Sequence, residues 1–448
     1  MPRLLSALCR LALPLGIWLA FLLVLAPRVH TTTFHTDESG WVSAGFYYSD
    51  LLARGDFNRQ AWDGATLSRW GDLNPNVGKL AIGAALRLGG APHWFGLYDI
   101  TRSRADNIAA GLVPPDAVLI PARFGVACFG ALACVLLFLI GRAAAGPWCG
   151  ALAAAFLGLN PLFENMSTRV MIDIPFLTLL LAICLTAMRL LHAAPERALR
   201  YALLCGGLSG LAGLVKIHGF LIGPGIMATT FAVRAHILGG WKRTVQQCAA
   251  ALALTVCVGY LLTPNFWPQW NALDLGAARA EASAIRNAGP AAFDGKGEDR
   301  FKHFEETFPA LANVTRPLRL PLLFVRWKAF NHWVAQTNPA WCFHEHRVAV
   351  QAGHLFWLYS TFPGEGLLGI LGLVLLSSRV VKAVRARTRD SATVVLSFFA
   401  VNYLVILAFQ DLDWNRYYLA SVVGYQIPAA FAVLAIASSA RALRARRG

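Results

Sequence analysis

Ten long apolar runs set the strongest limit on what this chain of 448 residues can fold into. They lie at 9–27, 118–141, 146–163, 171–191, 199–216, 217–233, 244–264, 355–378, 391–410 and 415–437. A helix of about 20 apolar residues can cross a bilayer, where only helices and closed barrels satisfy their own backbone hydrogen bonds. The pattern predicts an all-α polytopic membrane protein with about ten transmembrane helices. The runs at 199–216 and 217–233 are short, and a different division around Gly219 and Pro224 stays open.

The composition excludes three other classes of protein. Apolar residues make up 56% of the chain and charged residues 14%, whereas a soluble domain has about 45–50% and about 25%. This excludes an ordinary soluble enzyme, a disordered protein and a secreted disulfide scaffold. The net charge of +16 does not indicate nucleic acid, because the basic residues follow the ends of the apolar runs, as is typical of membrane proteins. We expect membrane lipids as partners and no nucleic acid.

The basic residues also predict how the chain is oriented. With ten spans, the segments on the side of the two termini carry many Arg and Lys residues and only two acidic residues, Glu196 and Asp390. Because cytoplasmic loops are enriched in Arg and Lys, we expect both termini in the cytoplasm. The first run lacks an obvious cleavage site and is expected to be a retained span. The Ala- and Arg-rich composition indicates a bacterial source, and hence the inner (plasma) membrane.

Two long segments, 28–117 and 265–354, are then expected outside the cytoplasm. We divide the chain into an N-terminal membrane module (1–264) whose first outer loop (28–117) is catalytic, an extracytoplasmic segment (265–354), and C-terminal membrane helices with a basic cytoplasmic tail (355–448). Loops of this length are usually functional. The pattern at 76–90 predicts a short helix at the outer membrane interface, and 278–289 and 298–308 predict polar helices.

Adjacent carboxylates in the sequence FHTDESGW are the first candidates for chemistry. Asp37 and Glu38 follow the first span closely. Neighbouring side chains on a loop point in different directions, which suits two separate roles. One carboxylate can accept a proton, while the other holds a substrate, a metal or an arginine. A solvated acidic loop is the alternative interpretation.

A second charged pair lies in the sequence NMSTRVMIDIP. Arg169 and Asp173 are four residues apart at the expected outer end of a span, and Pro175 suits the first turn of the following helix. Two structural interpretations stay open for this pair. Arg169 and Asp173 could form an i,i+4 ion pair, and Asp173 could stabilise the helix start through the helix dipole.

Further cations are expected at the same level of the membrane. Lys216 lies in GLAGLVKIHG, Arg416 follows QDLDWN at the start of the last span, and Arg123 opens the second span. A guanidinium group binds phosphate oxygens in pairs and Lys adds a point charge. Snorkelling at the interface explains each of these cations singly but explains the set poorly. The set therefore indicates a lipid phosphate.

Five sequences that follow one another along the chain resemble a known family. They are HTDES, NPNVGKLAIGAALRLGG, PARFGVACFGALACVLLFLIGRAAAG, TRVMIDIP and GLAGLVKIHG. With them, the chain resembles the C-type integral-membrane glycosyltransferases, in the protein O-mannosyltransferase-like branch that also includes the lipid A aminoarabinose transferases. The resemblance covers roughly residues 30–235. Where the protein mannosyltransferases have an HPPLGK-type segment, this chain has NPNVGK, which keeps Gly78 and Lys79 but lacks the His.

The resemblance implies a reaction and a role for several residues. Enzymes of this family transfer a sugar from a polyprenyl- or dolichyl-phosphate donor outside the cytoplasm. Asp37 would be the base that activates the acceptor, with Glu38 beside it, and Asp173 would position the acceptor or a metal. Arg123 matches the arginine that opens a span in the family. The residues predicted to bind the donor phosphate are Arg123, Arg169, Lys216 and Arg416, with Lys79 and His218 as further candidates.

The expected chemistry agrees with these residue types. A departing lipid phosphate needs fixed positive charge, and an attacking hydroxyl needs a base on the opposite side of the sugar. We expect an inverting glycosyltransferase that uses a polyprenyl-phosphate sugar at the outer face, with a protein, lipid or glycan acceptor. A divalent metal ion stays open as a cofactor, with Asp37 and Asp173 as its ligands. The alternatives are a transporter or lipid flippase, with a broken helix at Gly219–Pro224, and a non-catalytic scaffold.

Overall fold

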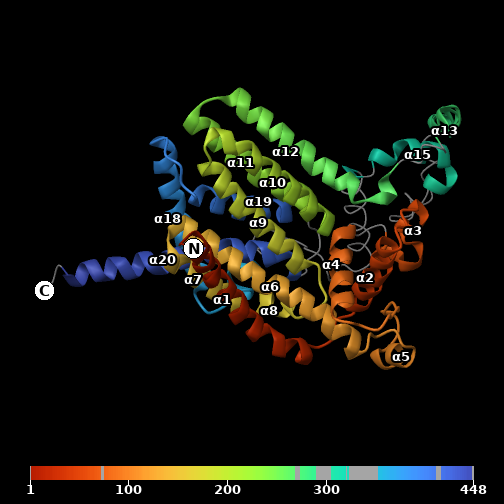
Figure 1. Ribbon diagram of the computed structural model, residues 1–448, viewed down its shortest axis with the longest axis horizontal. Helices are drawn as coiled ribbons and strands as arrows, with labels where there is room; N and C mark the ends of the chain where they lie inside the picture. Colours follow the sequence, from red (N-terminus) through yellow and green to blue (C-terminus); the bar gives the residue numbers. More distant parts are fainter. Residues whose placement is uncertain are drawn as a thin grey trace.

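The computed structural model describes residues 2–71, 75–267, 273–288, 304–318, 320–321, 352–409 and 415–445. Every regular element within these ranges is a helix, which confirms the all-α prediction. The long helices pack side by side in one bundle, and shorter helices gather at one end of it (Figure 1).

Ten helices correspond to the ten apolar runs. They are α1 (Pro2–Thr31), α6 (Asp116–Ala145), α7 (Pro147–Gly158), α9 (Asp173–His192), α10 (Pro195–Val215), α11 (Gly219–Leu238), α12 (Trp241–Leu261), α18 (Glu365–Arg385), α19 (Ala392–Phe409) and α20 (Leu419–Ala445). Within the described ranges, eight helices are long and apolar enough to span a membrane, whereas α7 and α19 are shorter. The chain is therefore an integral membrane protein with multiple spans, and about eight of the expected crossings are supported by helix length.

Glycine residues and short linkers set several of the helix ends. α10 ends at Val215 and α11 begins at Gly219, so the division between the two short runs is confirmed, and Pro224 lies inside α11. Gly239 and Gly240 separate α11 from α12 with φ angles of 70° and 78°. Glycine adopts positive φ without the steric cost that a side chain would add, so the chain can reverse direction between these two helices.

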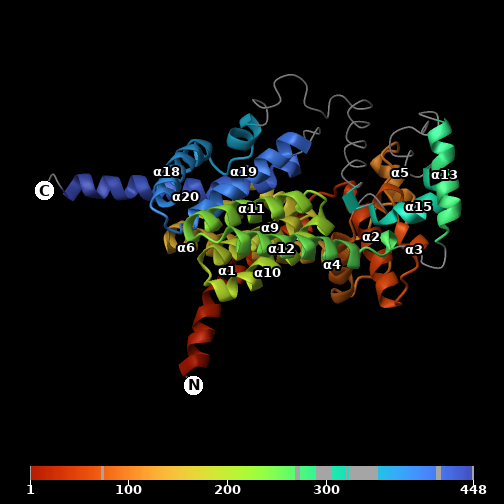
Figure 2. The same cartoon turned by 90° about the horizontal axis from the view of Figure 1, so that it is seen from above.

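Helix α9 lies at the centre of the bundle. In its apolar stretch 78% of the residues are buried, against 11% for α1. Helix α1 packs along α6 at the periphery of the bundle, and its N-terminal end projects (Figure 2). The side chains of Leu177, Leu180 and Ile183 belong to the main hydrophobic core. Because Asp173 is the first residue of α9, the best-buried helix holds that carboxylate in place.

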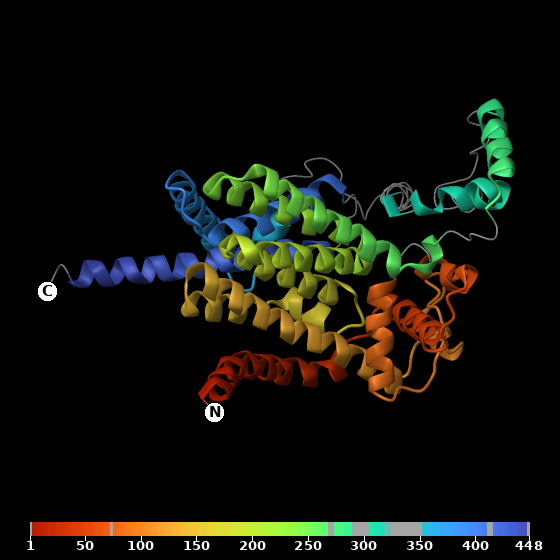
Figure 3. The same cartoon turned by 45° about the horizontal axis from the view of Figure 1, so that its top comes forward.

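The first outer segment folds into short helices at one end of the bundle (Figure 3). They are α2 (Asp37–Ala53), α3 (Arg59–Asp63), the 3-10 helix η1 (Ala65–Trp70), α4 (Asn76–Leu88) and α5 (Arg104–Ala109). The helix expected at 76–90 is confirmed as α4. The expectation that Asp37 and Glu38 lie on a loop is wrong, because they form the first turn of α2. Helix α2 is buried over most of its circumference, so its sequence shows no apolar period that would reveal a helix.

The second outer segment is described in part. It contains η2 (Pro264–Phe266), α13 (Leu275–Ala288), α15 (Pro309–Thr315) and η5 (Arg316–Leu318). Helix α13 confirms the polar helix expected at 278–289, while most of the helix expected at 298–308 lies outside the described residues. Arg316 Nη1 donates a hydrogen bond of 2.7 Å to the carbonyl oxygen of Asn265, which joins η5 to η2.

Candidate functional site

Four charged side chains meet where the first outer segment joins the bundle. Arg416 Nη1 donates a hydrogen bond of 2.5 Å to Asp37 Oδ2, and Lys216 Nζ donates one of 2.6 Å to Asp173 Oδ1. The ring of Tyr417 lies close to both cations, with its centroid 4.4 Å from Lys216 Nζ and 5.7 Å from Arg416 Cζ. We call Asp37, Asp173, Lys216 and Arg416 the charged cluster.

Helix ends place each member of the charged cluster. Asp37 and Asp173 are the first residues of α2 and α9, where the helix dipole favours a negative charge. Lys216 has an extended backbone at the end of α10, in the short linker before α11. Arg416 lies in the 3-10 helix η8 (Asn415–Tyr418), directly before α20. Four segments far apart in the sequence therefore converge on one point.

A pocket adjoins the charged cluster. Three of the four cluster residues line it together with His218 and Tyr417, and its other walls are apolar side chains such as Phe176, Ile222 and Val405. Its cavity volume is about 30 Å³, which holds about two water molecules. The cations contact the carboxylates in this state, so a phosphate ligand has to replace those contacts and widen the pocket.

Burial lowers the pKa of two pocket residues outside the spanning helices. Desolvation lowers the pKa of Lys216, and the adjacent Asp173 carboxylate opposes this shift. Desolvation, helped by the charge of Lys216, lowers the pKa of His218 to about 3. His218 is therefore neutral near pH 7 and adds no positive charge to the pocket at that pH.

Glu38 and Arg123 form a second, fully enclosed ion pair. Arg123 Nε and Nη2 each donate a hydrogen bond of 2.8 Å to one oxygen of the Glu38 carboxylate, and both side chains are buried. Glu38 also accepts from the backbone N–H groups of His35 and Val170, and Arg123 Nη1 donates to the carbonyl oxygens of Val29 and Thr32. This pair joins the end of α1, the start of α2, α6 and the chain before α9.

Arg169 lies beside this enclosed pair, away from Asp173. The i,i+4 ion pair considered for Arg169 and Asp173 is wrong, because the chain turns before α9 and Lys216 contacts Asp173 instead. Arg169 Nη2 donates to Thr33 Oγ1 at 3.2 Å. Pro175 does lie in the first turn of α9, as its sequence position predicts.

Lys79 lies inside the first outer segment and is not part of the charged cluster. Its ammonium group donates to Asn76 Oδ1 at 3.2 Å and to the carbonyl oxygen of Gly71. It also lies 4.1 Å from the ring centroid of Tyr48. Lys79 is fully buried, and its contacts tie α4 to the turn before it and to α2.

Three further pocket or cluster residues were not singled out from the sequence. The N–H of Asp37 donates to His35 Nδ1 at 3.1 Å, and burial lowers the pKa of His35, so this ring accepts as a neutral group. The ring of Tyr417 contacts both cations. Asn402 is buried in the pocket wall, and its Oδ1 atom has no hydrogen-bond partner among the residues that the structure describes. Asn402 is a polar residue inside an apolar run, and in the sequence this position is the feature that could have marked it as a functional residue.

The donor set of the cluster does not fit a metal ion. Asp37 and Asp173 each contact a cation rather than each other. Over the part of the chain that the structure describes, no three His, Cys, Asp or Glu side chains come together. Metal ions of the hard type need several oxygen ligands, and two separately paired carboxylates do not provide them.

Comparisons with known proteins confirm the resemblance inferred from the motifs. Residues 116–262 match the family described as dolichyl-phosphate-mannose-protein mannosyltransferase. A comparison with curated proteins finds no match.

The comparison with solved structures finds matches from an archaeon and a bacterium. The Archaeoglobus fulgidus oligosaccharyltransferase AglB, in complex with an inhibitory peptide and a dolichol-phosphate, has a TM-score of 0.54 at 13% identity, over 96% of this chain and 51% of AglB. A structure of the oligosaccharyltransferase from the same organism with Zn and sulfate has a TM-score of 0.50 at 13% identity, over 94% of this chain and 49% of that one. ArnT from Cupriavidus metallidurans bound to undecaprenyl phosphate has a TM-score of 0.37 at 13% identity, over 94% of this chain and 78% of ArnT. The chain thus shares the fold of the matched part of the Archaeoglobus fulgidus oligosaccharyltransferase and spans about half the length of that protein.

Proposed function

We propose that this protein is an inverting glycosyltransferase that moves a sugar from a polyprenyl-phosphate-linked donor to an acceptor hydroxyl at the extracytoplasmic membrane face. One observation carries the proposal: two carboxylates and two cations from four segments meet in the charged cluster. The family match over residues 116–262 supports a sugar-transfer reaction. The dolichol-phosphate bound by AglB, which shares the fold, supports a polyprenyl-phosphate donor.

In this proposal Lys216 and Arg416 bind the phosphate of the donor. A phosphate oxygen replaces Asp37 at the Arg416 guanidinium, and another replaces Asp173 at the Lys216 ammonium. Charge-assisted hydrogen bonds of this kind are about twice as strong as neutral ones. Binding of the donor therefore leaves the Asp37 carboxylate without its cation at the moment when a base is needed.

The proposed reaction is a single displacement at the anomeric carbon. The acceptor oxygen attacks C1 from the side opposite the phosphate, and its proton moves to the Asp37 carboxylate. The bond between C1 and the phosphate oxygen breaks, and its electron pair stays on the phosphate, whose charge Lys216 and Arg416 stabilise. One displacement inverts the anomeric configuration.

Glu38 and Arg123 take a positioning role in this scheme. Their hydrogen bonds fix the start of α2 against α6 and α9, and Asp37 is the residue before Glu38. A phosphate role for Arg123 would require it to leave four hydrogen bonds. We therefore assign the phosphate to Lys216 and Arg416, with Asp173 as the residue that orients Lys216.

Location and acceptor belong to the same proposal. We infer ten crossings, with α7 and α19 completing the eight longer spans, both termini in the cytoplasm, and a bacterial inner membrane. A peptide bound by AglB supports a protein acceptor, and lipid or glycan acceptors fit the same chemistry.

The test uses the purified protein in lipid nanodiscs with polyprenyl-phosphate sugars that carry a radiolabel in the sugar. A membrane and periplasmic extract supplies acceptors. We expect Asp37→Asn to bind the donor but to lose turnover by about 10²–10⁴-fold, the range for removal of a general base. Lys216→Met should lose donor binding.

Asp50→Asn is the matched control, because Asp50 lies on the same helix but contacts Arg87 and His93 outside the cluster. It should keep wild-type turnover. Equal turnover by Asp37→Asn and wild type would contradict the catalytic assignment. An absence of turnover of every donor by the wild type would contradict the transferase proposal, and transport of the intact lipid would then favour a flippase.

A further inference from the structure

A groove lies at the end of α6 and α9 that is remote from the charged cluster. Its walls are formed by Leu139, Arg142 and Ala143 of α6, by Leu185, Met188, Arg189 and His192 of α9, and by Ser391 before α19. Its volume is about 360 Å³, within the range of about 300–1,000 Å³ typical of ligand sites. Arg189 follows Asp173 by 16 residues of helix, so the groove lies about 24 Å along α9 from the cluster.

The groove combines an apolar floor with cations at its rim. Leu139, Leu185 and Met188 provide the floor, while Arg142 and Arg189 are exposed in the last turns of their helices. Neither guanidinium group makes an ion pair or a side-chain hydrogen bond within the described ranges. The helix dipole accounts for a cation at each helix end, but it does not account for a groove between them.

Two hydrogen bonds hold further basic groups at the same rim. A nitrogen of the His192 ring lies 3.0 Å from Ser391 Oγ, and Arg389 Nη1 donates to the His192 carbonyl oxygen at 3.0 Å. The carboxylate of this loop, Asp390, accepts two hydrogen bonds from Arg379, at 2.6 and 2.9 Å. Asp390 is therefore already neutralised by Arg379, and it does not balance the positive charges of Arg142 and Arg189 at the groove.

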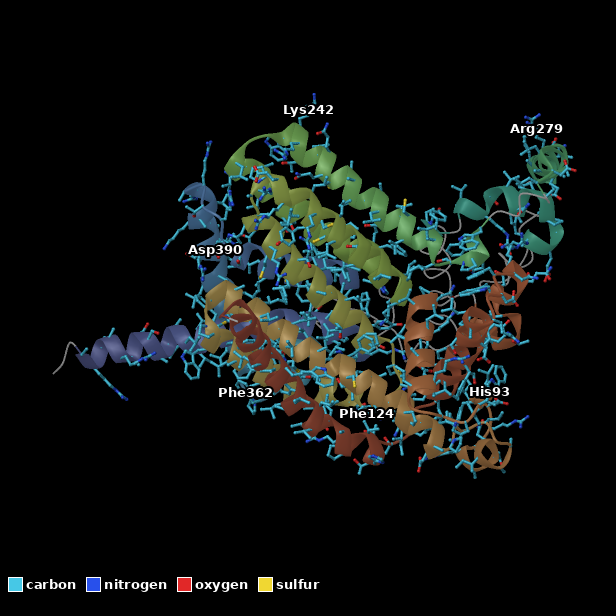
Figure 4. The ribbon with its side chains drawn as sticks, viewed as in Figure 1. His93, Phe124, Lys242, Arg279, Phe362 and Asp390 are labelled. Carbon is cyan, nitrogen blue, oxygen red and sulfur yellow. The ribbon has the colours of Figure 1, made fainter. Side chains whose placement is uncertain are left out.

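The position of the groove selects the kind of ligand. Arg142 and Arg189 lie close to the ends of helices that are long and apolar enough to span a membrane. Lys242 and Asp390 mark this end of the bundle, and His93 and Arg279 mark the opposite end (Figure 4). A ligand that matches an apolar floor and a cationic rim at this level has apolar chains and an anionic head group. Basic pockets between membrane helices bind phosphate-bearing lipid head groups in this way.

We propose that this groove is a binding site for an anionic membrane phospholipid, separate from the site of sugar transfer. The head-group phosphate contacts Arg142 and Arg189, and one acyl chain lies along Leu139, Leu185 and Met188. This inference does not depend on the proposed function, because it uses neither the charged cluster nor the donor.

The experiment counts lipids that stay bound to the intact protein. The protein is reconstituted in nanodiscs of equal phosphatidylglycerol and phosphatidylcholine, released, and examined by native mass spectrometry. We expect the wild type to retain phosphatidylglycerol in preference to phosphatidylcholine. Arg142→Gln with Arg189→Gln should reduce the retained phosphatidylglycerol by about tenfold or more, since each cation near the surface contributes to binding.

Two further variants separate this site from general surface charge. Lys382→Gln with Arg385→Gln removes the same charge from exposed positions in the last turn of α18 and should leave retention unchanged. Leu185→Trp fills the groove without a change of charge and should reduce retention. Equal losses in both double variants, no effect of Leu185→Trp, or displacement of the lipid by free glycerol phosphate would each overturn the proposal.

Discussion

Asp37 and Glu38 are neighbours in the sequence, but their side chains lie in different environments. Glu38 is fully buried and accepts four hydrogen bonds. Asp37 is partly exposed beside Arg416. Glu38 would have to leave four hydrogen bonds to contact a substrate, whereas the partly exposed Asp37 can exchange its partner. The environment therefore favours Asp37 for chemistry and Glu38 for structure.

Glu38→Gln is expected to destabilise the protein strongly. It removes the charge that balances buried Arg123, and loss of one partner of a buried ion pair costs about 3–5 kcal/mol. The melting temperature in detergent, followed by tryptophan fluorescence, should fall well below that of the wild type. Asp37→Asn should change it little. A Glu38→Gln protein that melts with the wild type would contradict the structural role of this pair.

His218 is expected to make stability depend on acid pH. Its pKa falls from the usual 6.5 to about 3 in the folded protein, so between these values the unfolded chain binds a proton that the folded chain does not. The free energy of unfolding therefore rises with pH across this window, by at most about 1.4 kcal/mol per pH unit.

The melting temperature of the wild type should drop on acidification from pH 6.5 to pH 4 more steeply than that of His218→Gln. Identical slopes for the two proteins would show that His218 is not held neutral by burial. Near pH 7 and above, His218 is deprotonated in both the folded and the unfolded chain, so it should add nothing to the pH dependence of the melting temperature.

Part of the site could be predicted from single residues. Asp37, Asp173, Lys216 and Arg416 were all expected near one membrane face, because each lies close to an end of an apolar run on the expected outer side. Which cation contacts which carboxylate was not predictable, since Arg416 reaches Asp37 across 379 positions of sequence. The proximity of Arg169 and Asp173 in the sequence suggested the wrong partner, because the chain between them is not helical.

At the scale of elements, α10 and α12 pack through small residues. A Cβ added at Gly206 would lie 2.2 Å from the carbonyl oxygen of Ala251, and one at Gly210 would lie 2.8 Å from that of Thr255. Gly206 and Gly210 are four residues apart and so share one face of α10. Small residues at this spacing let two membrane helices approach closely. This contact holds α10, and with it Lys216 at its end.

Gly206→Leu is expected to separate α10 from α12 and lower the melting temperature. Overpacking of a close contact costs about 1–3 kcal/mol. Gly207→Leu is the matched control, because a Cβ there meets only Leu254 Cδ2 at 3.8 Å. Comparable melting temperatures for the two variants would show that the close approach of α10 and α12 does not contribute to stability.

Most elements could be predicted from the sequence because each apolar run is longer than a helical turn by a wide margin. The ten runs, the break before Gly219 and helix α4 were all found. Helix α2 was missed because its sequence is apolar or small on every side and begins with two acids. Its burial against α4 and the bundle is a tertiary property that a local pattern does not carry.

At the scale of the whole molecule, charge is divided between the two ends of the bundle. Arg142, Arg189, Lys242 and Arg379 lie at one end, and the charged cluster lies at the other. Arg and Lys are enriched on the cytoplasmic side of membrane proteins. This division predicts the orientation of the chain, while the packing of the ends, including the groove at Arg142, was visible only in the structure.

Orientation can be tested by labelling with a membrane-impermeant maleimide in intact cells. The native cysteines are first replaced. His93→Cys and Arg279→Cys should be labelled from outside, whereas Lys242→Cys and Arg387→Cys should be labelled only after the cells are opened. The reverse pattern would place the charged cluster in the cytoplasm and contradict the proposed site of transfer.

The central claim is that the charged cluster transfers a sugar off its lipid at one membrane face. The most direct measurement places a polyprenyl-phosphate sugar, radiolabelled in the sugar, in the leaflet of proteoliposomes that faces the charged cluster, with acceptor extract on the same side. We expect the label to move to the acceptor with inverted anomeric configuration, while sugar-free polyprenyl phosphate accumulates in the same leaflet. Movement of the intact lipid-linked sugar to the opposite leaflet, with no labelled acceptor, would contradict the claim.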